Sequence, residues 1–478
     1  MPRQTSKRTL FFCQSCGQES PRWMGFCPAC GDRTPLVEAP MPDAPSSRGW
    51  TSPSASEPQE LAGVPSEERG RISLRYREMD RVLGGGLVPG SVALFAGEPG
   101  VGKSTLLLQA ADFVAAKGVK VLYVSGEESE QQIKLRSNRL GLSGRGIYLL
   151  AETDVDQIIH HLEERLPGLV VIDSIQTLST AEASSGPGSV TQVRECALRL
   201  MRWAKARGTP VLLAGHVTKD GTLAGPRVLE HMVDVVLYLE GENLGAHRLL
   251  RSVKNRFGST NEVAMFRMGD GGLEEVSDPS KALLEERGQG AVGSAVVSVL
   301  EGSRPLLVEI QALTSPSALP VPRRTANGVD YNRMIMITAV LGRRARLSLA
   351  NQDIIVNVAG GLRVSEPGAD LGMALAIASS FRNQPIKPGL VAIGEVGLSG
   401  ELRSAPQTDR RLAEAARLGF SSCVLPAWAR GKIPATTGLE LVYAPTVGEA
   451  MRLSLERRSG KGGVAEESEL ANLEKLEE

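Results

Sequence analysis

The sequence has 478 residues, which is long enough for two or three domains with sizeable cores. Lysine plus arginine and aspartate plus glutamate both number 54, so binding of nucleic acid would need a local patch of charge rather than a whole-protein field. No apolar run approaches the ~20 residues that span a bilayer, and the N-terminus lacks the apolar core of a signal peptide. We therefore expect a cytoplasmic protein with no membrane partner.

Four of the six cysteines lie within residues 1–36. They form two pairs, Cys13 with Cys16 and Cys27 with Cys30, and ten residues separate the pairs. Each pair can present two thiolates to one tetrahedral ion, and four sulfur ligands with no open position favour structural Zn²⁺ over a catalytic metal. We predict a zinc-binding module here, in which the metal supplies most of the folding energy.

Residues 37–68 are rich in proline, serine, alanine and glutamate and show no apolar period, which is typical of a flexible linker. Over residues 69–279, short apolar runs alternate with helical stretches. This alternation indicates a mostly parallel sheet covered on both faces. The predicted strands are 91–97, 119–126, 168–174, 210–216 and 233–241.

The sequence GEPGVGKST follows the first predicted strand and precedes a helix, as a phosphate-binding P-loop does. Its glycines let backbone N–H groups point at phosphate oxygens, and the start of the helix adds partial positive charge. We expect Lys103 to reach the β- and γ-phosphates of ATP, and Ser104 and Asp173 to serve a Mg²⁺ ion. The residues predicted to line the nucleotide are Gly97, Glu98, Pro99, Gly100, Val101, Gly102, Lys103, Ser104, Thr105, Asp173 and His216.

Two acidic residues, Glu127 and Glu128, follow the strand 119–126. A carboxylate there faces the γ-phosphate across the cleft and can orient the attacking water, so both are candidate catalytic residues. Acids at a helix start also suit the helix dipole without any catalytic role. His216 ends the strand 210–216 and is either a sensor of the γ-phosphate or a simple polar group at a strand end.

The far end of this domain carries SVKNRFGST, residues 252–260. Lys254 and Arg256 lie there on a turn that ends in glycine. Cations at such a position can reach a nucleotide held by a neighbouring subunit, as an arginine finger does, and are catalytic candidates on that basis. On these residues alone, a basic hairpin with no such role is the simpler interpretation.

The four-cysteine motif, GEPGVGKST, YVSGEES, VVIDSIQT, GSVTQVRE, GHVTKDG and KNRFG occur in this order and together resemble the bacterial RadA (Sms) family over residues 8–456. The resemblance implies a RecA-like ATPase that forms hexameric rings on single-stranded and branched DNA. It implies that the protein promotes branch migration in homologous recombination and repair and that a RecA-type recombinase is its partner. It also implies that Lys254 and Arg256 act across the boundary between subunits.

In RecA-like proteins, two flexible loops follow the strand that carries the Mg²⁺-associated aspartate and the sensor strand, and both touch DNA. The corresponding segments here are 180–190 and 218–228. Both are rich in glycine or proline and carry no helix or strand pattern, as DNA-contacting loops would. The second contains Lys219 and Arg227.

A second α/β domain is predicted over 280–456, followed by a polar tail at 457–478. It resembles the proteolytic domain of Lon, in which a lysine activates a serine nucleophile. Matching the two sequences places Ala369 at the serine and Asp409 at the lysine. Because alanine has no nucleophilic oxygen and aspartate cannot act as a neutral amine, the resemblance implies a scaffold rather than a protease.

Basic residues gather locally in this second domain despite the neutral total; they are Arg323, Arg324, Arg343, Arg344 and Arg346. They could contact DNA phosphates or simply be solvated. The expected fold class is thus α/β, with a RecA-like P-loop core, a zinc-binding module and a Lon-like domain. We favour an ATP-driven DNA motor over an ATP-gated proteolytic or regulatory machine and over an ATPase ring that only organises partners.

Overall fold

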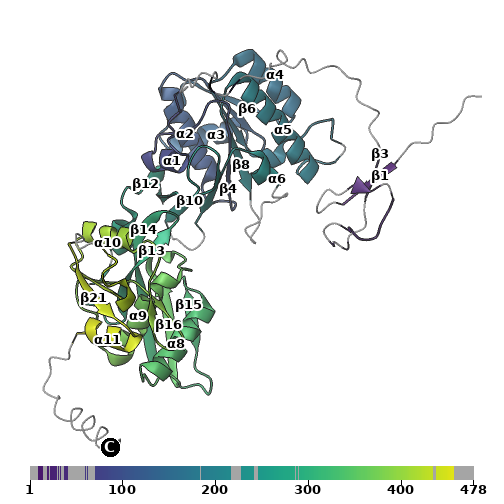
Figure 1. Cartoon of the computed structure of the whole chain (residues 1–478). Helices are drawn as coiled ribbons and strands as arrows, with labels where there is room; N and C mark the ends of the chain where they lie inside the picture. The colour runs from purple at the N-terminus through teal and green to yellow at the C-terminus, as the bar shows by residue number, and fades with distance from the viewer. Residues whose placement is uncertain are drawn as a thin grey trace, which may run out of the picture. The chain divides into compact units, whose positions relative to one another are not determined.

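The computed structural model describes residues 9–13, 19–20, 22–28, 31, 33, 37–40, 60, 62, 70–183, 185–216, 228–241, 246–285, 287–288, 290–433 and 438–456. The chain divides into two compact units between Ser277 and Asp278 (Figure 1). The predicted tail at 457–478 and the second predicted DNA loop, up to residue 227, lie outside the described residues.

A small antiparallel sheet lies near the N-terminus, with the strand order β2-β1-β3. Its strands are β1 (Thr9–Phe12), β2 (Glu19–Ser20) and β3 (Val37–Pro40). β3 belongs to the segment predicted as linker, yet its four residues pair with β1. A strand this short, ending in proline, has no apolar period by which the sequence could reveal it.

A nine-stranded sheet forms the centre of the first unit, in the order β12-β11-β10-β9-β4-β8-β7-β5-β6. The six strands from β9 to β6 in this order are parallel, and β10, β11 and β12 extend the sheet in antiparallel fashion. The strands are β4 (Val92–Gly97), β5 (Val121–Ser125), β6 (Ile147–Ala151), β7 (Leu169–Asp173), β8 (Val211–His216), β9 (Val235–Glu240), β10 (His247–Asn255), β11 (Val263–Gly269) and β12 (Gly272–Glu275).

Each of the five predicted strands is present, as β4, β5, β7, β8 and β9. β6 was not predicted, because this edge strand is only partly buried and therefore lacks a continuous apolar run. The helices are α1 (Arg77–Val82), α2 (Lys103–Ala116), α3 (Glu130–Arg139), α4 (Val155–Arg165), α5 (Val190–Arg207) and α6 (Val228–Met232), with the short 3₁₀ helix η2 (Ile175–Thr177).

Alternate residues of the parallel strands pack on opposite faces of this sheet, as the period of a strand requires. Phe95 and Tyr123 belong to the core that contains the buried residues of α2, whereas Leu94 and Leu122 belong to the core formed with α4 and α5. Figure 1 shows α2 and α3 on one side of the sheet and α4, α5 and α6 on the other. The predicted covering of both faces is confirmed.

The second unit contains a seven-stranded mixed sheet, in the order β15-β16-β14-β13-β17-β20-β21, and a two-stranded ribbon, β18-β19. Its strands are β13 (Ser294–Glu301), β14 (Arg304–Pro316), β15 (Arg324–Asn327), β16 (Gln352–Val358), β17 (Leu390–Ala392), β18 (Glu395–Val396), β19 (Leu402–Arg403), β20 (Ser422–Pro426) and β21 (Glu440–Ala444). Its helices are α7 (Pro279–Leu284), α8 (Tyr331–Arg344), η3 (Ala359–Gly361), η4 (Pro367–Ala369), α9 (Asp370–Arg382), α10 (Thr408–Arg417), η5 (Ala427–Ala429) and α11 (Val447–Ser454).

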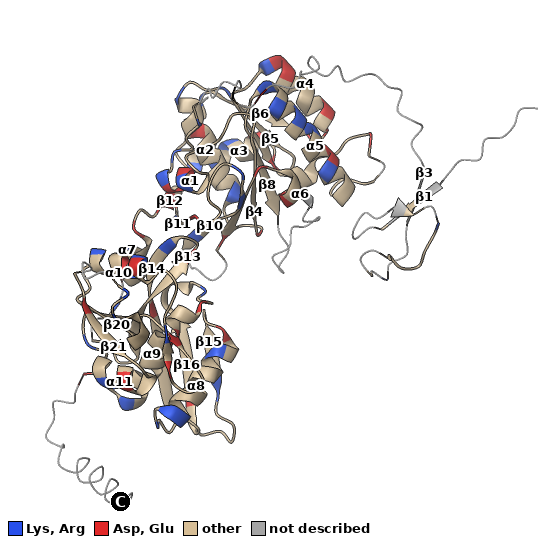
Figure 2. Cartoon of the chain, in the orientation of Figure 1, with Lys and Arg blue, Asp and Glu red and all other residues tan. Residues whose placement is uncertain are grey.

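Helices cover both faces of this second sheet as well. Val296 of β13 packs with Leu412 of α10, and its neighbour Val297 lies against Gly372 of α9. Acidic and basic residues are interspersed along the helices of both units (Figure 2), in keeping with the zero net charge. Within the described ranges, every helix is too short or too polar to cross a bilayer.

Candidate nucleotide-binding site

The predicted P-loop connects β4 to α2 at the carboxyl edge of the parallel strands. β4 ends at Gly97, and α2 begins at Lys103 after Gly102, whose φ of 113° lies in the left-handed region. A Cβ atom at Gly97 would lie 2.5 Å from the carbonyl oxygen of Leu239, so larger residues are excluded there by close packing. The loop therefore makes a tight turn from the end of β4 into the start of α2, as phosphate-binding loops do.

Lys103 is only 4% exposed, although its side chain carries a charge. Its Nζ donates to the carbonyl oxygens of Gly97 at 2.8 Å and Glu98 at 2.9 Å, and lies 3.2 Å from Nδ1 of His216. Burial lowers the pKa of Lys103 to about 8, against the opposing effect of the carboxylates of Asp173 and Glu127. The loop thus holds an ammonium group that neutral oxygen atoms only partly compensate.

Glu127 joins the same group of contacts. Its Oε1 accepts a hydrogen bond of 2.5 Å from Ser174 Oγ and lies 3.1 Å from His216 Nε2. Because the ammonium of Lys103 can only donate to Nδ1, the proton of His216 is on Nε2 and is donated to Glu127. Partial burial raises the pKa of Glu127, but the hydrogen bonds of Ser174 and His216 outweigh it and the pKa is lowered overall.

Glu128 points elsewhere. Its carboxylate forms an ion pair with Arg136 of α3, and its backbone N–H donates to Ser125 Oγ at 3.0 Å. The two consecutive glutamates, which sequence reasoning left equivalent, therefore separate in the structure. Glu127 lies beside Lys103 and His216, and Glu128 tethers the first turns of α3 to the end of β5.

Asp173 ends β7, where the sequence predicted a Mg²⁺-associated carboxylate, and is 7% exposed. Its Oδ2 accepts a hydrogen bond of 2.7 Å from the hydroxyl of Tyr123, which is fully buried on the neighbouring strand β5. Tyr123 and Ser174 orient the site, yet sequence reasoning missed both. The available signals were a polar hydroxyl within an otherwise apolar strand and a serine directly after Asp173.

Lys254 and Arg256 contact their own chain. A register shift between Ser252 and Lys254 interrupts the pairing of β10 with β9. Arg256 forms an ion pair of 3.1 Å with Asp234. Lys254 Nζ donates to three backbone carbonyls at the end of α6, those of Glu230 at 2.8 Å, His231 at 2.9 Å and Val233 at 2.8 Å.

Two of the four predicted zinc ligands are described. Cys13 and Cys27 are both buried and lie in one small core. The N–H of Gly31, a residue with φ of 75°, donates to the carbonyl of Cys27 at 2.9 Å, as in a metal-binding knuckle. Cys16 and Cys30 lie outside the described residues. In the described part of the chain no group of three or more His, Cys, Asp or Glu is placed to hold a metal, which leaves the four-cysteine prediction untested.

The Lon-like turn ends at Ala369, which is 1% exposed, and α9 begins at the next residue. Each acid beside this turn is bound by an arginine through two hydrogen bonds. Glu366 accepts from Arg411 at 2.7 and 2.6 Å, and Asp370 accepts from Arg333 at 2.6 and 2.6 Å. Asp409, the residue matched to the Lon lysine, lies in the first turn of α10.

The basic residues predicted to gather in the second unit differ in their surroundings. Arg324 donates to backbone carbonyls, among them that of Leu349 at 2.9 Å, and so ties β15 to the loop before β16. Arg343 and Arg344 end α8, and Arg344 lines a cavity of about 450 Å³ together with Arg333 and Arg403. Lys219 and Arg227, predicted in the second loop, lie outside the described residues.

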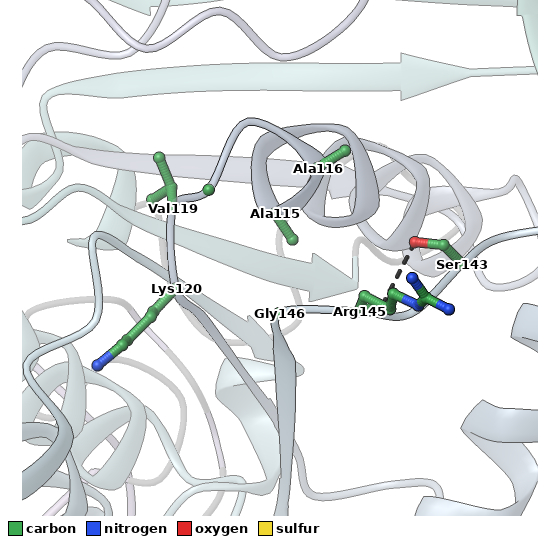
Figure 3. A pocket seen from close by; sticks show the side chains of 8 residues that line it. Ala115, Ala116, Val119, Lys120, Ser143, Arg145 and Gly146 are labelled. Carbon is green, nitrogen blue, oxygen red and sulfur yellow. Dashed lines mark hydrogen bonds between the residues drawn. The ribbon is translucent and has the colours of Figure 1, made fainter.

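A second pocket, of about 370 Å³, lies at the opposite edge of the nine-stranded sheet, where β5 and β6 begin. Two cations, Lys120 and Arg145, line it with Ser143 and the end of α2. Figure 3 shows Lys120 and Arg145 extending away from one another. Only the carboxyl edge of the sheet, among the described residues, brings a buried lysine, a histidine and two carboxylates together.

Known families match parts of both units. The AAA domain family matches residues 57–222, and the family described as subunit ChlI of Mg-chelatase matches residues 331–428. The solved structure of the KaiC-like protein PH0186 from Pyrococcus horikoshii OT3 matches 43% of this chain and 99% of its own, at 21% identity and a TM-score of 0.37. The family matches confirm the predicted fold class, a P-loop ATPase unit followed by a Lon-like α/β unit; the zinc-binding module stays a prediction.

Full-length relatives extend the match across the chain. The DNA repair protein RadA of Halalkalibacterium halodurans is 50% identical over 454 residues, which cover 94% of this chain and 99% of that protein. The DNA repair protein RadA of Bacillus subtilis is 47% identical over 457 residues, which cover 94% and 99%. The chain therefore belongs to the RadA family of DNA repair proteins, and its first unit is an ATPase of the P-loop class.

Proposed function

We propose that the protein is an ATP-driven motor that moves single-stranded and branched DNA through a six-membered ring during homologous recombination and repair in the cytoplasm. The observation that carries the proposal is the chain of contacts from Lys103 through His216 and Glu127 to Ser174. Ser174 begins the segment that leads to the first predicted DNA loop. A change at the phosphate site thus has a short physical route to that loop. A RecA-type recombinase is the expected partner on the same DNA.

The residues of the site fit ATP and Mg²⁺, because the loop turns directly into the N-terminus of α2 and holds a buried cation, Lys103. Lys103 would hold the β- and γ-phosphates, and Ser104 and Asp173 would hold the Mg²⁺, which supplies charge neutralisation when bound. Glu127 would orient the attacking water and accept its proton, as its lowered pKa keeps it ionised at neutral pH. His216 would sense the γ-phosphate, since it touches both Lys103 and Glu127.

Lys254 and Arg256 would act on a nucleotide held by the neighbouring subunit. In that role Lys254 exchanges the carbonyls of α6 for phosphate oxygens. Lys254→Ala should then lose ATP hydrolysis while keeping nucleotide affinity. Rings mixed from Lys254→Ala and Lys103→Ala subunits should regain part of the activity, because some boundaries then combine an intact Lys103 with an intact Lys254. Mixed rings without any regain would contradict action between subunits.

The Lon-like unit would be a scaffold that holds the ring together and is not a protease. Ala369 offers no nucleophile, and the ion pairs of Glu366 and Asp370 fix the turn around it. Purified protein should cleave no unfolded polypeptide such as casein, with or without ATP. Proteolytic activity that co-purifies with the ring and persists in an Ala369→Gly variant would contradict the scaffold role.

The N-terminal module would bind one Zn²⁺ through Cys13, Cys16, Cys27 and Cys30. The burial of Cys13 and Cys27 in one core and the knuckle turn at Gly31 support this assignment. Metal analysis should find one zinc per chain, and Cys27→Ser should remove it while the ATPase unit keeps its thermal transition. A zinc content that is unchanged in Cys27→Ser would contradict the ligand set.

One experiment tests the motor. ATP hydrolysis is measured with and without a single-stranded oligonucleotide at rising salt, together with the mass of the assembly in solution. A motor should be stimulated by DNA, lose DNA affinity steeply with salt through counterion release, and have the mass of six chains. A rate of ATP hydrolysis that DNA does not change would favour an ATPase ring that only organises partners. A mass of one chain in the presence of nucleotide and DNA would contradict the ring.

A further inference from the structure

The segment between β7 and α5 is folded where the sequence predicted a flexible loop. It begins at Ser174, beside Glu127, and ends at Ser189, whose side chain caps α5. Gly186, Pro187 and Gly188 had suggested a structureless stretch at 180–190. Its described residues, which exclude only Ser184, instead form a turn held from the interior of the unit.

Gln192, in the first turn of α5, makes most of these contacts and is only 3% exposed. Its Oε1 accepts from the N–H of Thr180 at 2.8 Å. Its Nε2 lies within hydrogen-bond distance of three carbonyl oxygens, those of Thr180 at 3.1 Å, Ala183 at 3.0 Å and Ser185 at 2.8 Å. One buried amide thus satisfies both arms of the turn, and a buried amide without these partners would be costly.

Arg199 fastens the same turn at a second point. Its guanidinium is 3% exposed and forms ion pairs with Glu182 of the turn and Asp156 of α4. Asp156 in turn accepts from Thr180 Oγ1 at 3.0 Å. The turn is therefore tied to α4 and α5 together, whereas the Glu182 side chain itself remains 70% exposed.

The beginning of the segment is fixed to the phosphate site. Gln176 Nε2 donates to the carbonyl oxygen of His216 at 3.2 Å, and Thr177 Oγ1 donates to that of Ser174 at 2.8 Å. A Cβ atom at Gly126 would lie 2.0 Å from Thr177 Oγ1, so the segment packs directly against the residue before Glu127. Both ends of the segment are held, one by the site and one by Gln192.

We infer that Gln192 is a positioning residue that preforms the turn 180–189 to receive single-stranded DNA. The inference rests on the proposed function and names the side chain that shapes its first DNA contact. A flexible loop loses conformational entropy when a ligand orders it, and that loss weakens binding. A turn already fixed by a buried amide avoids most of this loss at the moment when DNA binds.

Gln192→Glu tests the inference in the full-length protein, because glutamate keeps the size and the acceptor but has no donor for the three carbonyls. The concentration of a poly-dT oligonucleotide that half-saturates ATP hydrolysis should rise about tenfold. The rate of ATP hydrolysis at saturating DNA should change less than about twofold. Bound DNA would still order the turn in the variant, and the cost of this ordering would weaken only DNA binding. A purely structural role would instead lower the rate at saturating DNA, through loss of folded protein, and leave the half-saturating concentration unchanged.

Gln109 provides a matched control. It is 2% exposed in α2 and likewise binds a backbone segment, with Oε1 accepting from Leu273 N–H at 3.0 Å and Nε2 lying 3.3 Å from Leu273 O. Gln109→Glu should leave the half-saturating DNA concentration unchanged. If Gln192→Glu does not fold, Gln192→Met, which keeps the volume, takes its place in the same comparison.

Hydrogen exchange measures the turn without DNA. The amide of Thr180 should be protected in the wild type and exchange at least ~10-fold faster in Gln192→Met. A wild-type DNA half-saturation in the Gln192 variant, or an unprotected Thr180 amide in the wild type, would overturn the inference. If the wild type shows no DNA stimulation, the proposed function fails instead, and the exchange rates still decide whether Gln192 holds the turn.

Discussion

Each unit of the molecule has a glycine-containing turn that leads into a buried helix. The two turns differ in how far their charged side chains are paired with opposite charges. In the P-loop, the ammonium of Lys103 contacts two neutral carbonyls and a histidine ring, and its pKa falls to about 8. At the Lon-like turn, Glu366 and Asp370 are each bound by an arginine through two hydrogen bonds. The cation of the P-loop is thus only partly compensated, whereas the acids at the Lon-like turn are fully paired.

The largest expected effect comes from removing the undercompensated charge. Lys103→Ala should lower ATP hydrolysis by at least ~100-fold, because the site loses its main electrostatic contact with the phosphates. Steady-state phosphate release measures this. Lys120→Ala, at the opposite edge of the same sheet, should hydrolyse ATP at the wild-type rate. Equal rates in the two variants would contradict the role of Lys103 in binding the phosphates.

The two neighbouring glutamates sharpen the comparison within the ATPase unit. Glu127→Gln should lower the turnover rate about 100-fold with nucleotide affinity retained, because the amide cannot accept a proton from water. Glu128→Gln should stay within about threefold, since it loses only an ion pair with Arg136. Single-turnover hydrolysis with labelled ATP separates the two. The reverse order of effects would assign the catalytic role to Glu128.

The paired charges of the second unit should act on stability. Arg411 is fully buried, so Arg411→Met leaves Glu366 without its partner and should lower the free energy of unfolding by about 3–5 kcal/mol. Arg411→Met combined with Glu366→Met should recover part of that loss, because no charge then remains uncompensated. Urea unfolding of the full-length protein measures both variants. A larger loss in the double variant would show that the pair itself is strongly stabilising.

The smallest expected effect is a pH dependence. With a pKa of about 8, Lys103 is largely neutral at pH 9, so nucleotide must bind together with a proton. Affinity should fall about tenfold per pH unit above pH 8, and Lys103→Arg, which stays charged, should show no such slope. Calorimetry in buffers of different ionisation enthalpy measures the proton. In the nucleotide-free protein the same lowered pKa makes the free energy of unfolding rise with pH above about 8. If nucleotide binding at pH 9 took up no proton, the lowered pKa of Lys103 would be contradicted.

Features that depend on residues close together in the sequence could be predicted, whereas contacts between distant elements could not. The P-loop and the strands β4, β5, β7, β8 and β9 were predictable, because local glycines and apolar runs encode them. The separation of Glu127 from Glu128 was not, because it depends on His216 and Arg136 from other elements. The described residues of 180–189 form no helix or strand, as the glycines and proline predicted, but the contacts that hold this turn come from Gln192, outside the segment. The hydrogen bond from Tyr123 to Asp173 could not be predicted either, because it joins two different strands.

The three carbonyls that surround Lys254 have a consequence for the short helix α6. The last carbonyls of a helix have no partner within it, so the ammonium of Lys254 stabilises the C-terminal end of α6. That ammonium has one other proposed destination, a nucleotide across the subunit boundary. If Lys254 moved to such a nucleotide, the carbonyls at the end of α6 would lose their donor, and ATP bound by one subunit would loosen the end of a helix in its neighbour.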